Sequence, residues 1–515
     1  MREFGDFQTP PELVSSVLRV VYRGKEPWSR ALEPTCGVGN FIVGLRSVLN
    51  PPREIQGIEL QPSYAARTQI SSSGHIKIHN ADIFRMNLAE LQWSEIGPLL
   101  VVGNPPWVTS SELGSLESAN LPQKSNFKGS SGFGAKTGES NFDIAEFIWI
   151  KLIKELAWAN PTIALLCKTA VARNVLAYSE SAGLPISTPE IYLIDAKKWF
   201  DAAVDACLFR IDVGGEERNY LASVYSNLDS DIPQSVLGIA NGAMVSNCEA
   251  YEKLSFLDGE SPVEWRQGVK HDASAVMELT QGEDGVLRNR IGEQVCVEDE
   301  RVYPLLKSSD LNGGHNPPAR FRTLITQREL GEDTMQLREN FPRLWEYLSA
   351  HQAAFEARKS SIYTGRPPFS IFGVGPYSFS EYKVAISGLY KTVRFRVVGP
   401  QLERPVMLDD TCYFVSCDSA RQAAILAAIL NTETCLSFIN SLIFLDSKRP
   451  ITKKVLQRLD LSALFGRVDH DALLLSASQN LAVLGQQPLA PNDLIDFAWP
   501  GSRSSQVSLF TETTL

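Results

Sequence analysis

The segment 99–107 limits the possible fold more than any other stretch of this sequence. It begins with four apolar residues, which predict a short buried strand. Pro105 and Pro106 follow after two residues, and because proline has no backbone N–H, strand pairing must stop there. The sequence therefore predicts a buried strand that ends in a rigid turn, with Asn104 and Trp107 as its polar and aromatic side chains.

This turn carries groups that suit the binding of a planar amino group. The amide oxygen of Asn104 and the carbonyl of Pro105 can converge as acceptors, and Trp107 adds a flat apolar face. Two such acceptors would bind the amino hydrogens and stabilise the positive charge that develops as the nitrogen attacks an electrophilic methyl group. An ordinary proline turn beside a core tryptophan would show the same residues, so this motif alone leaves both interpretations open.

A second motif, earlier in the chain, predicts a ligand site. Residues 31–42 have the pattern of a short strand, a glycine loop and a helix, which is typical of a βα cofactor turn. A strand over 55–60 contains Glu59, and it follows Gly39 by about 20 residues, a spacing that places a carboxylate near a ribose. With a further strand at 76–79, these segments predict a parallel doubly wound α/β sheet whose ligand crevice lies at the carboxyl ends of the strands.

The residues around the glycine loop favour S-adenosylmethionine over a dinucleotide. A dinucleotide fingerprint needs a third glycine where this chain has Ile42, and Glu33 beside the loop would repel a pyrophosphate. S-adenosylmethionine has no phosphate and carries an ammonium, a sulfonium, ribose hydroxyls and an adenine amino group. Because carboxylates accept hydrogen bonds from such groups, we expect Glu33, Glu59 and Asp82 to contact this cofactor.

The order of these motifs resembles that of DNA adenine-N6 methyltransferases. The chain contains Thr9-Pro10-Pro11, then Glu33-Pro34-Thr35-Cys36-Gly37-Val38-Gly39, then Asn104-Pro105-Pro106-Trp107. This order is similar to the gamma arrangement of the TaqI-like restriction-modification enzymes, in which a target-recognition domain ends the chain. The resemblance covers most of the sequence.

The resemblance implies an activity, two domains and a set of site residues. The expected activity is methyl transfer from S-adenosylmethionine to the N6 amino group of a flipped adenine in duplex DNA, in a restriction-modification or related defence system. The expected domains are a class I methyltransferase sheet over 1–215 and a mixed α+β target-recognition domain over 216–515. The implied catalytic residues are Asn104, Pro105, Trp107 and Phe200, and the implied cofactor residues are Thr9, Glu33, Thr35, Gly37, Gly39, Glu59, Asp82, Ile83 and Asn104.

Charge is distributed in a way that permits DNA binding by part of the chain. The formal net charge of −10 argues against indiscriminate nucleic-acid binding, but residues 319–404 hold 10 Arg and 3 Lys against 8 acidic residues. One long helix is expected over 335–359, within that basic segment. Surface turns of any interaction domain would have a similar composition. The expected DNA-binding residues are Lys124, Lys128, Lys136, Arg266, Lys270, Lys307, Lys448, Arg449 and Lys453.

Several other classes of site are not indicated. The eight cysteines form no C-x-x-C pair, and His75 and His79 alternate as in a strand, so we expect reduced thiols and no metal. No apolar run reaches the length of a membrane span, and residues 1–6 lack a signal-peptide pattern, so a cytoplasmic location is expected. The resemblance leaves room for a cognate restriction endonuclease as a partner.

Two kinds of alternative stay open. A cytosine-N4, ribosomal RNA or protein-glutamine methyltransferase would present a planar amino nitrogen to a similar turn. Asn at position 104 favours adenine by resemblance, and the 300 residues after residue 215 favour DNA over a small or peptide substrate. The other alternative is a catalytically silent DNA-binding or assembly subunit that retains the fold. Separately, Trp199 and Phe200 would also suit the hydrophobic core, which is the alternative to a contact of Phe200 with the base.

Overall fold

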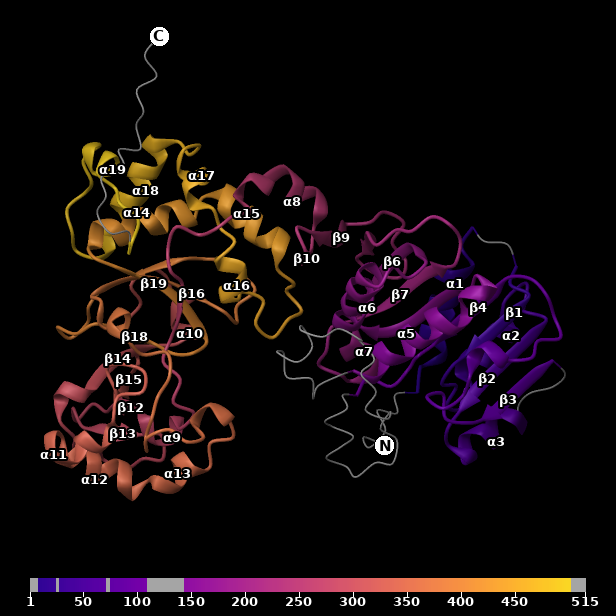
Figure 1. Ribbon diagram of the computed structural model, residues 1–515, viewed down its shortest axis with the longest axis horizontal. Helices are drawn as coiled ribbons and strands as arrows, with labels where there is room; N and C mark the ends of the chain where they lie inside the picture. Colours follow the sequence, from indigo (N-terminus) through magenta and orange to yellow (C-terminus); the bar gives the residue numbers. More distant parts are fainter. Residues whose placement is uncertain (1–7, 25–26, 71–74, 109–142, 502–515) are drawn as a thin grey trace, which may run out of the picture. The chain divides into compact units, whose positions relative to one another are not determined.

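The computed structural model describes residues 8–24, 27–70, 75–108 and 143–501, in two compact units (Figure 1). Unit 1 is Met1–Glu249 and unit 2 is Ala250–Leu515. Unit 1 therefore extends past residue 215, where the sequence predicts a boundary. The glycines at 214 and 215 end one strand, but three further strands up to residue 245 join the same sheet.

In the described part of unit 1, ten strands form one sheet in the order β10-β9-β8-β6-β7-β5-β4-β1-β2-β3. The strands are β1 Arg30–Glu33, β2 Glu54–Glu59, β3 Ile76–Asn80, β4 Leu99–Gly103, β5 Thr162–Lys168, β6 Ile186–Ile194, β7 Ala206–Val213, β8 Ala222–Tyr225, β9 Ser235–Ala240 and β10 Ala243–Val245. The helices are α1 Pro11–Tyr22, α2 Asn40–Ser47, α3 Pro62–Ile70, α5 Ile144–Leu156, α6 Thr169–Ser181 and α7 Ala196–Phe200.

The sheet confirms the predicted doubly wound α/β fold and adds an antiparallel strand. Strands β1 to β5 pair in parallel, with β1 between β2 and β4. Strand β7 lies between β5 and β6 and is antiparallel to both. Only residues 195–205 join β6 to β7, and a connection this short favours antiparallel neighbours. The reversal of strand order at β1 and β4 leaves a crevice at the carboxyl ends of these strands.

Helices cover both faces of this sheet. In α1, apolar residues recur with helical spacing, and Leu13 packs in one core cluster with Leu100 and Val102 of β4. Because side chains alternate along a strand, the residue between them points to the opposite face. On that face Trp149 of α5 packs on Phe209 of β7, with 4.7 Å between ring centroids.

Within the described part of unit 2, strands form two smaller sheets, ordered β11-β19-β16-β17 and β13-β12-β15-β14-β18. The strands are β11 Arg266–Gln267, β12 Glu278–Gln281, β13 Leu287–Asn289, β14 Val302–Leu306, β15 Phe321–Leu324, β16 Tyr382–Ser387, β17 Arg396–Val398, β18 Met407–Leu408 and β19 Cys412–Cys417. This is the mixed α+β region that the sequence predicts.

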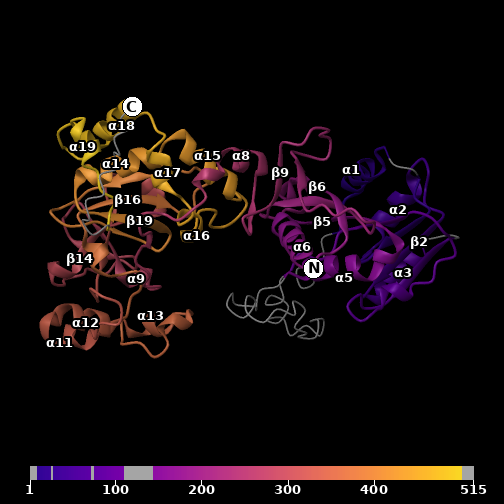
Figure 2. The ribbon, with the colours of Figure 1, turned by 45° about the horizontal axis from the view of Figure 1, so that its top comes forward.

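Helices lie at both ends of unit 2, and α9 and α10 lie among its strands (Figure 2). Helices α11 to α13 lie at one end, α14 and α17 to α19 lie at the other, and the strands lie between them. The bounds are α8 Cys248–Leu254, α9 Ser274–Met277, α10 Ser308–Leu311, α11 Leu337–Asn340, α12 Pro342–Ala350, α13 Gln352–Glu356, α14 Ala420–Leu430, α15 Glu433–Leu442, α16 Lys453–Leu456, α17 Leu461–Phe465, α18 His470–Val483 and α19 Asn492–Ile495.

The single long helix expected over 335–359 was a wrong prediction. The segment folds as α11, α12 and α13, with breaks at Phe341 (φ −141°) and His351 (φ −108°). Pro342 explains the first break, because it has no N–H and restricts the residue before it to extended conformations. Apolar residues keep a helical spacing across the break, which is why the sequence pattern predicted one helix.

Length and apolar character do not single out a membrane-spanning helix in the described ranges. No one helix there satisfies both criteria, whereas α14 and α15, bent by 63°, satisfy them only as a pair.

A buried ion pair joins Asp258, near the beginning of unit 2, to Arg458, which is 200 residues further along the chain. The carboxylate of Asp258, 7% exposed, accepts hydrogen bonds from Nε of Arg458 at 2.8 Å and from Nη2 at 2.7 Å. The hydroxyl of Tyr251 donates to the same carboxylate. Such a pair costs much more to break at one partner than an exposed pair does.

We expect Arg458→Leu to lower the free energy of unfolding of unit 2 by about 3–5 kcal/mol, because it leaves Asp258 buried without its cation. The matched control is Arg421→Leu, which removes an arginine that is 65% exposed and pairs with Asp493, and it should cost about 0–1 kcal/mol. Urea unfolding of both variants measures the difference. Equal losses in the two variants would contradict the structural role of the buried pair.

Candidate active site

The carboxyl ends of β1, β2, β3 and β4 contribute to one cavity in unit 1. Its walls come from residues 33–37, 58–61 and 81–84, from Asn104, Pro106 and Val108, and from helix α5. Eight of the nine cofactor residues implied by the sequence line it: Thr9, Glu33, Thr35, Gly37, Glu59, Asp82, Ile83 and Asn104. The fold thus brings three separate motifs of the chain to one place.

The ninth residue, Gly39, lies off the wall and shapes the loop behind it. Gly39 has φ +84° and forms the N-terminal cap of α2. A Cβ atom there would come within 2.5 Å of the methyl group of Thr68, whose hydroxyl donates to the carbonyl of Gly37 at 3.0 Å. The glycine therefore permits both the left-handed turn and the close packing of α3 against the loop.

Two carboxylates of the cavity are held by backbone amides. Glu59 accepts from the N–H of Gly37 at 2.7 Å and from the N–H of Gln61 at 2.8 Å, one at each oxygen. Asp82 accepts from the N–H of Phe84 at 2.9 Å. Because a carboxylate has about four lone-pair sites, these bonds fix its orientation and leave acceptor capacity for a ligand.

A third carboxylate, Glu33, lies deeper, and its side chain is almost fully buried. Its Oε2 atom and the hydroxyl of Thr35 have no hydrogen-bond partner within the described ranges. Burial raises the pKa of Glu33 well above its ordinary value, and the charge of Glu59 adds to that effect, while a hydrogen bond from the backbone of Ile42 opposes it. Buried polar atoms of this kind fit a ligand that donates hydrogen bonds or carries positive charge, as S-adenosylmethionine does.

The turn after β4 supplies another part of the wall. Asn104 and Pro106 line the cavity, whereas Pro105 and Trp107 lie behind it. The indole of Trp107 is 5% exposed and donates to the carbonyl of Leu166 at 3.3 Å. Its ring lies 5.0 Å from that of Phe200 at an interplanar angle of 73°. The structure therefore brings the two predicted aromatic residues together, in edge-to-face contact with each other.

Sequence reasoning missed other residues of this wall. Phe84 lines the cavity and packs edge to face on Phe147, with 5.3 Å between ring centroids. Ile144 and Ile148 line it from α5, one helical turn apart. Phe84 could have been predicted, because it lies two residues after Asp82. Ile144 and Ile148 could not, because α5 reaches the cavity only through tertiary packing.

The expected DNA-binding residues have different surroundings. Lys124, Lys128 and Lys136 lie outside the described residues. Arg266 pairs with Glu264 and stacks 4.4 Å from the ring centroid of Tyr377. Lys448 is exposed, and Lys453 begins α16 half-buried.

Three further cations of that set are paired with carboxylates of unit 2. The amine of Lys307 lies 2.5 Å from Glu278. The amine of Lys270 lies 2.6 Å from Asp272 and 3.9 Å from Asp410, and Arg449 lies 3.1 Å from the same Asp410 oxygen. The fold thus brings Lys270 and Arg449, which are far apart in the sequence, to one carboxylate. The residues that the structure describes contain no group of three His, Cys, Asp or Glu that could hold a metal ion.

Comparison with known proteins identifies a relative that matches most of this chain. No family model matches this chain. The Type II methyltransferase M.NspV of Nostoc sp. is 38% identical over 469 residues, which are 90% of this chain and 97% of that protein.

Comparison with solved structures gives weaker likenesses. The Type IIL restriction-modification enzyme MmeI, in complex with DNA, is 13% identical with a TM-score of 0.49, and the match covers 92% of this chain and 67% of that chain. The methyltransferase subunit of a type I restriction-modification system from Streptococcus thermophilus is 14% identical with a TM-score of 0.31, over 42% of this chain and 46% of that one. The assignment to a family rests on the relative from Nostoc sp.

The buried carboxyl of Glu33 predicts a pH dependence of stability. Its pKa is raised in the folded state above the value of about 4.3 in the unfolded chain, so the folded state binds the proton more tightly. Stability is therefore lost as the pH rises above about 4.3, because the unfolded chain ionises first.

We expect Glu33→Gln to remove this loss. The free energy of unfolding of the variant, relative to that of the wild type, should increase between about pH 5 and about pH 8. Urea unfolding across that range measures it, with Glu180→Gln on the exposed side of α6 as the control. A difference that is constant with pH, or that falls as the pH rises, would refute the assignment of a raised pKa to Glu33.

Proposed function

This chain belongs to the Type II methyltransferases, and we propose that it methylates the N6 amino group of adenine at a specific sequence of duplex DNA. The methyl donor is S-adenosylmethionine, and the biological setting is a restriction-modification system. One observation carries the proposal: Asn104 lines the same cavity as Glu33, Glu59 and Asp82. An acceptor for an amino group thus lies beside a site suited to a cationic nucleoside.

The three carboxylates would hold different parts of the cofactor. Glu59 would accept from the ribose hydroxyls, because its backbone bonds already fix its orientation. Asp82 would accept from the adenine amino group, and the buried Glu33 would neutralise positive charge. S-adenosylmethionine, when bound, supplies an electrophilic methyl group on its sulfonium. The residues of this chain bind it, orient it and exclude water from it.

The turn after β4 would hold the amino group of the target base. The amide oxygen of Asn104 and the carbonyl oxygen of Pro105 would each accept one amino hydrogen. This orients the nitrogen lone pair and stabilises the positive charge that develops on nitrogen during transfer. The reaction releases a proton from the methylated nitrogen.

Access to the nitrogen requires base flipping, because N6 lies inside the base stack of a duplex. A flipped adenine would stack on Trp107. Since the two rings meet at 73°, that adenine would lie roughly perpendicular to Phe200. Trp107 is 5% exposed, so stacking requires a movement that uncovers its face.

Recognition of DNA is assigned to the chain after residue 215, most of which is unit 2. The exposed Lys448 and the half-buried Lys453 would contact phosphates. Arg266, which stacks on Tyr377, presents a guanidinium that can donate to a guanine edge. A cognate endonuclease that cuts the unmethylated sequence is the partner that a restriction-modification role implies.

The catalytic role of Asn104 is open to a direct test. We expect Asn104→Ala to lower the single-turnover rate of methyl transfer about a hundredfold, because it removes one preorganised acceptor. Affinity for S-adenosylmethionine should change much less. The control is Asn50→Ala, which makes the same change at an exposed position of unit 1. A near-normal transfer rate for Asn104→Ala on cognate DNA would remove this residue from the mechanism.

The cofactor site is tested by calorimetry. We expect Glu59→Ala to weaken both S-adenosylmethionine and its demethylated product about tenfold to a hundredfold, because the acceptor for the ribose is lost. Glu59→Gln retains one acceptor and should weaken them less. Glu180→Ala, at an exposed site on α6, should leave both affinities unchanged. Wild-type affinity in Glu59→Ala would place the ribose elsewhere.

A further inference from the structure

A second cleft, of about 640 Å³, lies entirely within unit 2. Its walls come from residues 269–274 after β11, from Glu278 at the start of β12, from 357–360 after α13, and from 409–410 between β18 and β19. Its volume lies within the range of about 300–1,000 Å³ that is typical of ligand-binding sites. The proposed function assigns no role to this cleft.

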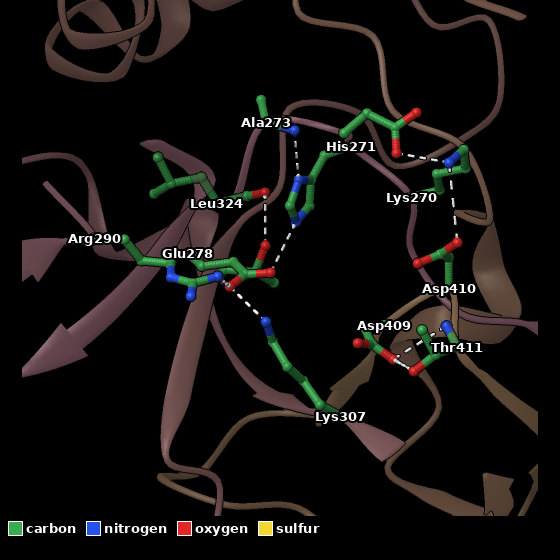
Figure 3. A network of polar contacts seen from close by, with 12 residues as sticks. Lys270, His271, Ala273, Glu278, Arg290, Lys307, Leu324, Asp409, Asp410 and Thr411 are labelled. Atoms are coloured by element: carbon green, nitrogen blue, oxygen red, sulfur yellow. Dashed lines mark hydrogen bonds and ion pairs between the residues drawn. The ribbon is translucent and has the colours of Figure 1, made fainter. Parts of the chain in front are cut away.

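Most carboxylates around the cleft are neutralised by cations of the protein (Figure 3). Glu278 lies 2.5 Å from Lys307 and 3.3 Å from Arg290. Asp272 and Asp410 are paired with Lys270, and Asp410 is also paired with Arg449. These ion pairs offset the charges of the carboxylates and connect the walls of the cleft.

Asp409 is the exception. Its Oδ1 atom accepts from the N–H of Thr411 at 3.1 Å, from the hydroxyl of Thr411 at 2.5 Å and from the thiol of Cys412 at 3.4 Å. Over the ranges that the structure describes, no Lys, Arg or His forms an ion pair with Asp409, and its Oδ2 atom accepts no hydrogen bond. Figure 3 shows that second oxygen turned away from Thr411. One oxygen of Asp409 is thus fixed, and the other remains an available acceptor on the cleft wall.

The charges of the cleft decide which ligand fits. Asp409 is a carboxylate that no cation of the described residues neutralises, so an anion beside it is disfavoured. The same walls offer the cations Arg358 and Lys359, and Lys359 is exposed. A ligand that carries both a hydrogen-bond donor and acceptors satisfies both sets of groups. The edge of a nucleic-acid base has this pattern.

We propose that this cleft receives the edge of a DNA base, with Asp409 as the acceptor for the exocyclic amino group of cytosine or adenine. The proposal rests on the proposed function, since it names how the DNA sequence is selected. The amino group would donate to Oδ2 of Asp409. Lys359 would donate to an acceptor of the same base pair or to its phosphate. Asp409 would therefore determine specificity and would have no part in the methyl transfer itself.

The test compares wild type and Asp409→Asn as full-length proteins. Mapping of modified bases in DNA methylated by the wild type first gives the recognition sequence. Methyl-transfer rates are then measured on duplexes that each carry one changed base pair. In Asp409→Asn the amide oxygen can still accept from Thr411 and Cys412, while the available acceptor becomes a donor. The rate on cognate DNA should fall about tenfold to a hundredfold, with preference lost at one base pair only.

Base analogues identify the amino group. Purine in place of adenine, or 2-pyrimidinone in place of cytosine, removes the exocyclic amine. At the position read by Asp409, this removal should slow the wild type about tenfold to a hundredfold and leave Asp409→Asn nearly unaffected. If the purine substitution gives this result, Asp409 contacts an adenine; if the 2-pyrimidinone substitution gives it, Asp409 contacts a cytosine.

Two further variants control for effects on folding. Asp418→Asn makes the same change at an exposed aspartate beyond β19 and should keep the wild-type preference. Asp409→Glu keeps a carboxylate, so it should retain the preference at a reduced rate, and it replaces Asp409→Asn as the test if the latter does not fold. An unchanged preference in Asp409→Asn, equal slowing on every duplex, or loss of preference in Asp409→Glu would overturn the proposal. No transfer from the wild type into any DNA would overturn the proposed function and this inference together.

Discussion

The reversal of strand order at β1 and β4 is the constraint on which the site depends. Connections that leave these strands in opposite directions cannot cover the space between their carboxyl ends, so a crevice forms there. The glycine loop after β1, the carboxylates after β2 and β3, and the proline turn after β4 all reach this crevice. The chemistry proposed for the chain requires these groups in one place, and the sheet alone brings them there.

Carboxylates have two different states in this protein, and the difference is informative. Those of Asp258, Glu278 and Asp410 are neutralised by arginine or lysine within unit 2, so removal of the cation would leave a charge without its partner. Glu33 and Asp409 each keep an oxygen without a hydrogen bond in the part of the chain described, at the wall of a cavity. A buried acceptor without a hydrogen bond lowers the stability of the fold, and a ligand that donates a hydrogen bond to it can offset that loss.

The sequence predicted unit 1 well, because its signals are local. The apolar run before Asn104, the glycine loop at 37–39 and the strand that ends in Glu59 each identify themselves within a few residues. The helix break at Pro342 could have been predicted, because a proline ends most helices at the preceding residue. The continuous apolar spacing on both sides of Pro342 led to the prediction of one helix instead. The extension of unit 1 to Glu249 depends on strand pairing and carries no local signal.

The residues that line the candidate site were predicted in part, for the same reason. Residues next to strand ends were found, whereas Ile144 and Ile148 reach the cavity only through the packing of α5. In unit 2, sequence analysis identified Lys270 and Arg449 as cations, but their common contact with Asp410 joins residues from different parts of the chain. Whether a lysine contacts a phosphate or a neighbouring carboxylate is decided by such contacts, and composition does not encode them.

The proposed activity is methylation of the N6 amino group of adenine in duplex DNA. Incubation of the full-length protein with duplex DNA and S-adenosylmethionine labelled in its methyl group, followed by digestion to nucleosides, tests it most directly. If the proposed activity is right, the label is recovered in N6-methyl-2′-deoxyadenosine. Recovery in N4-methylcytosine, in RNA or in protein, or no transfer to DNA, would contradict it.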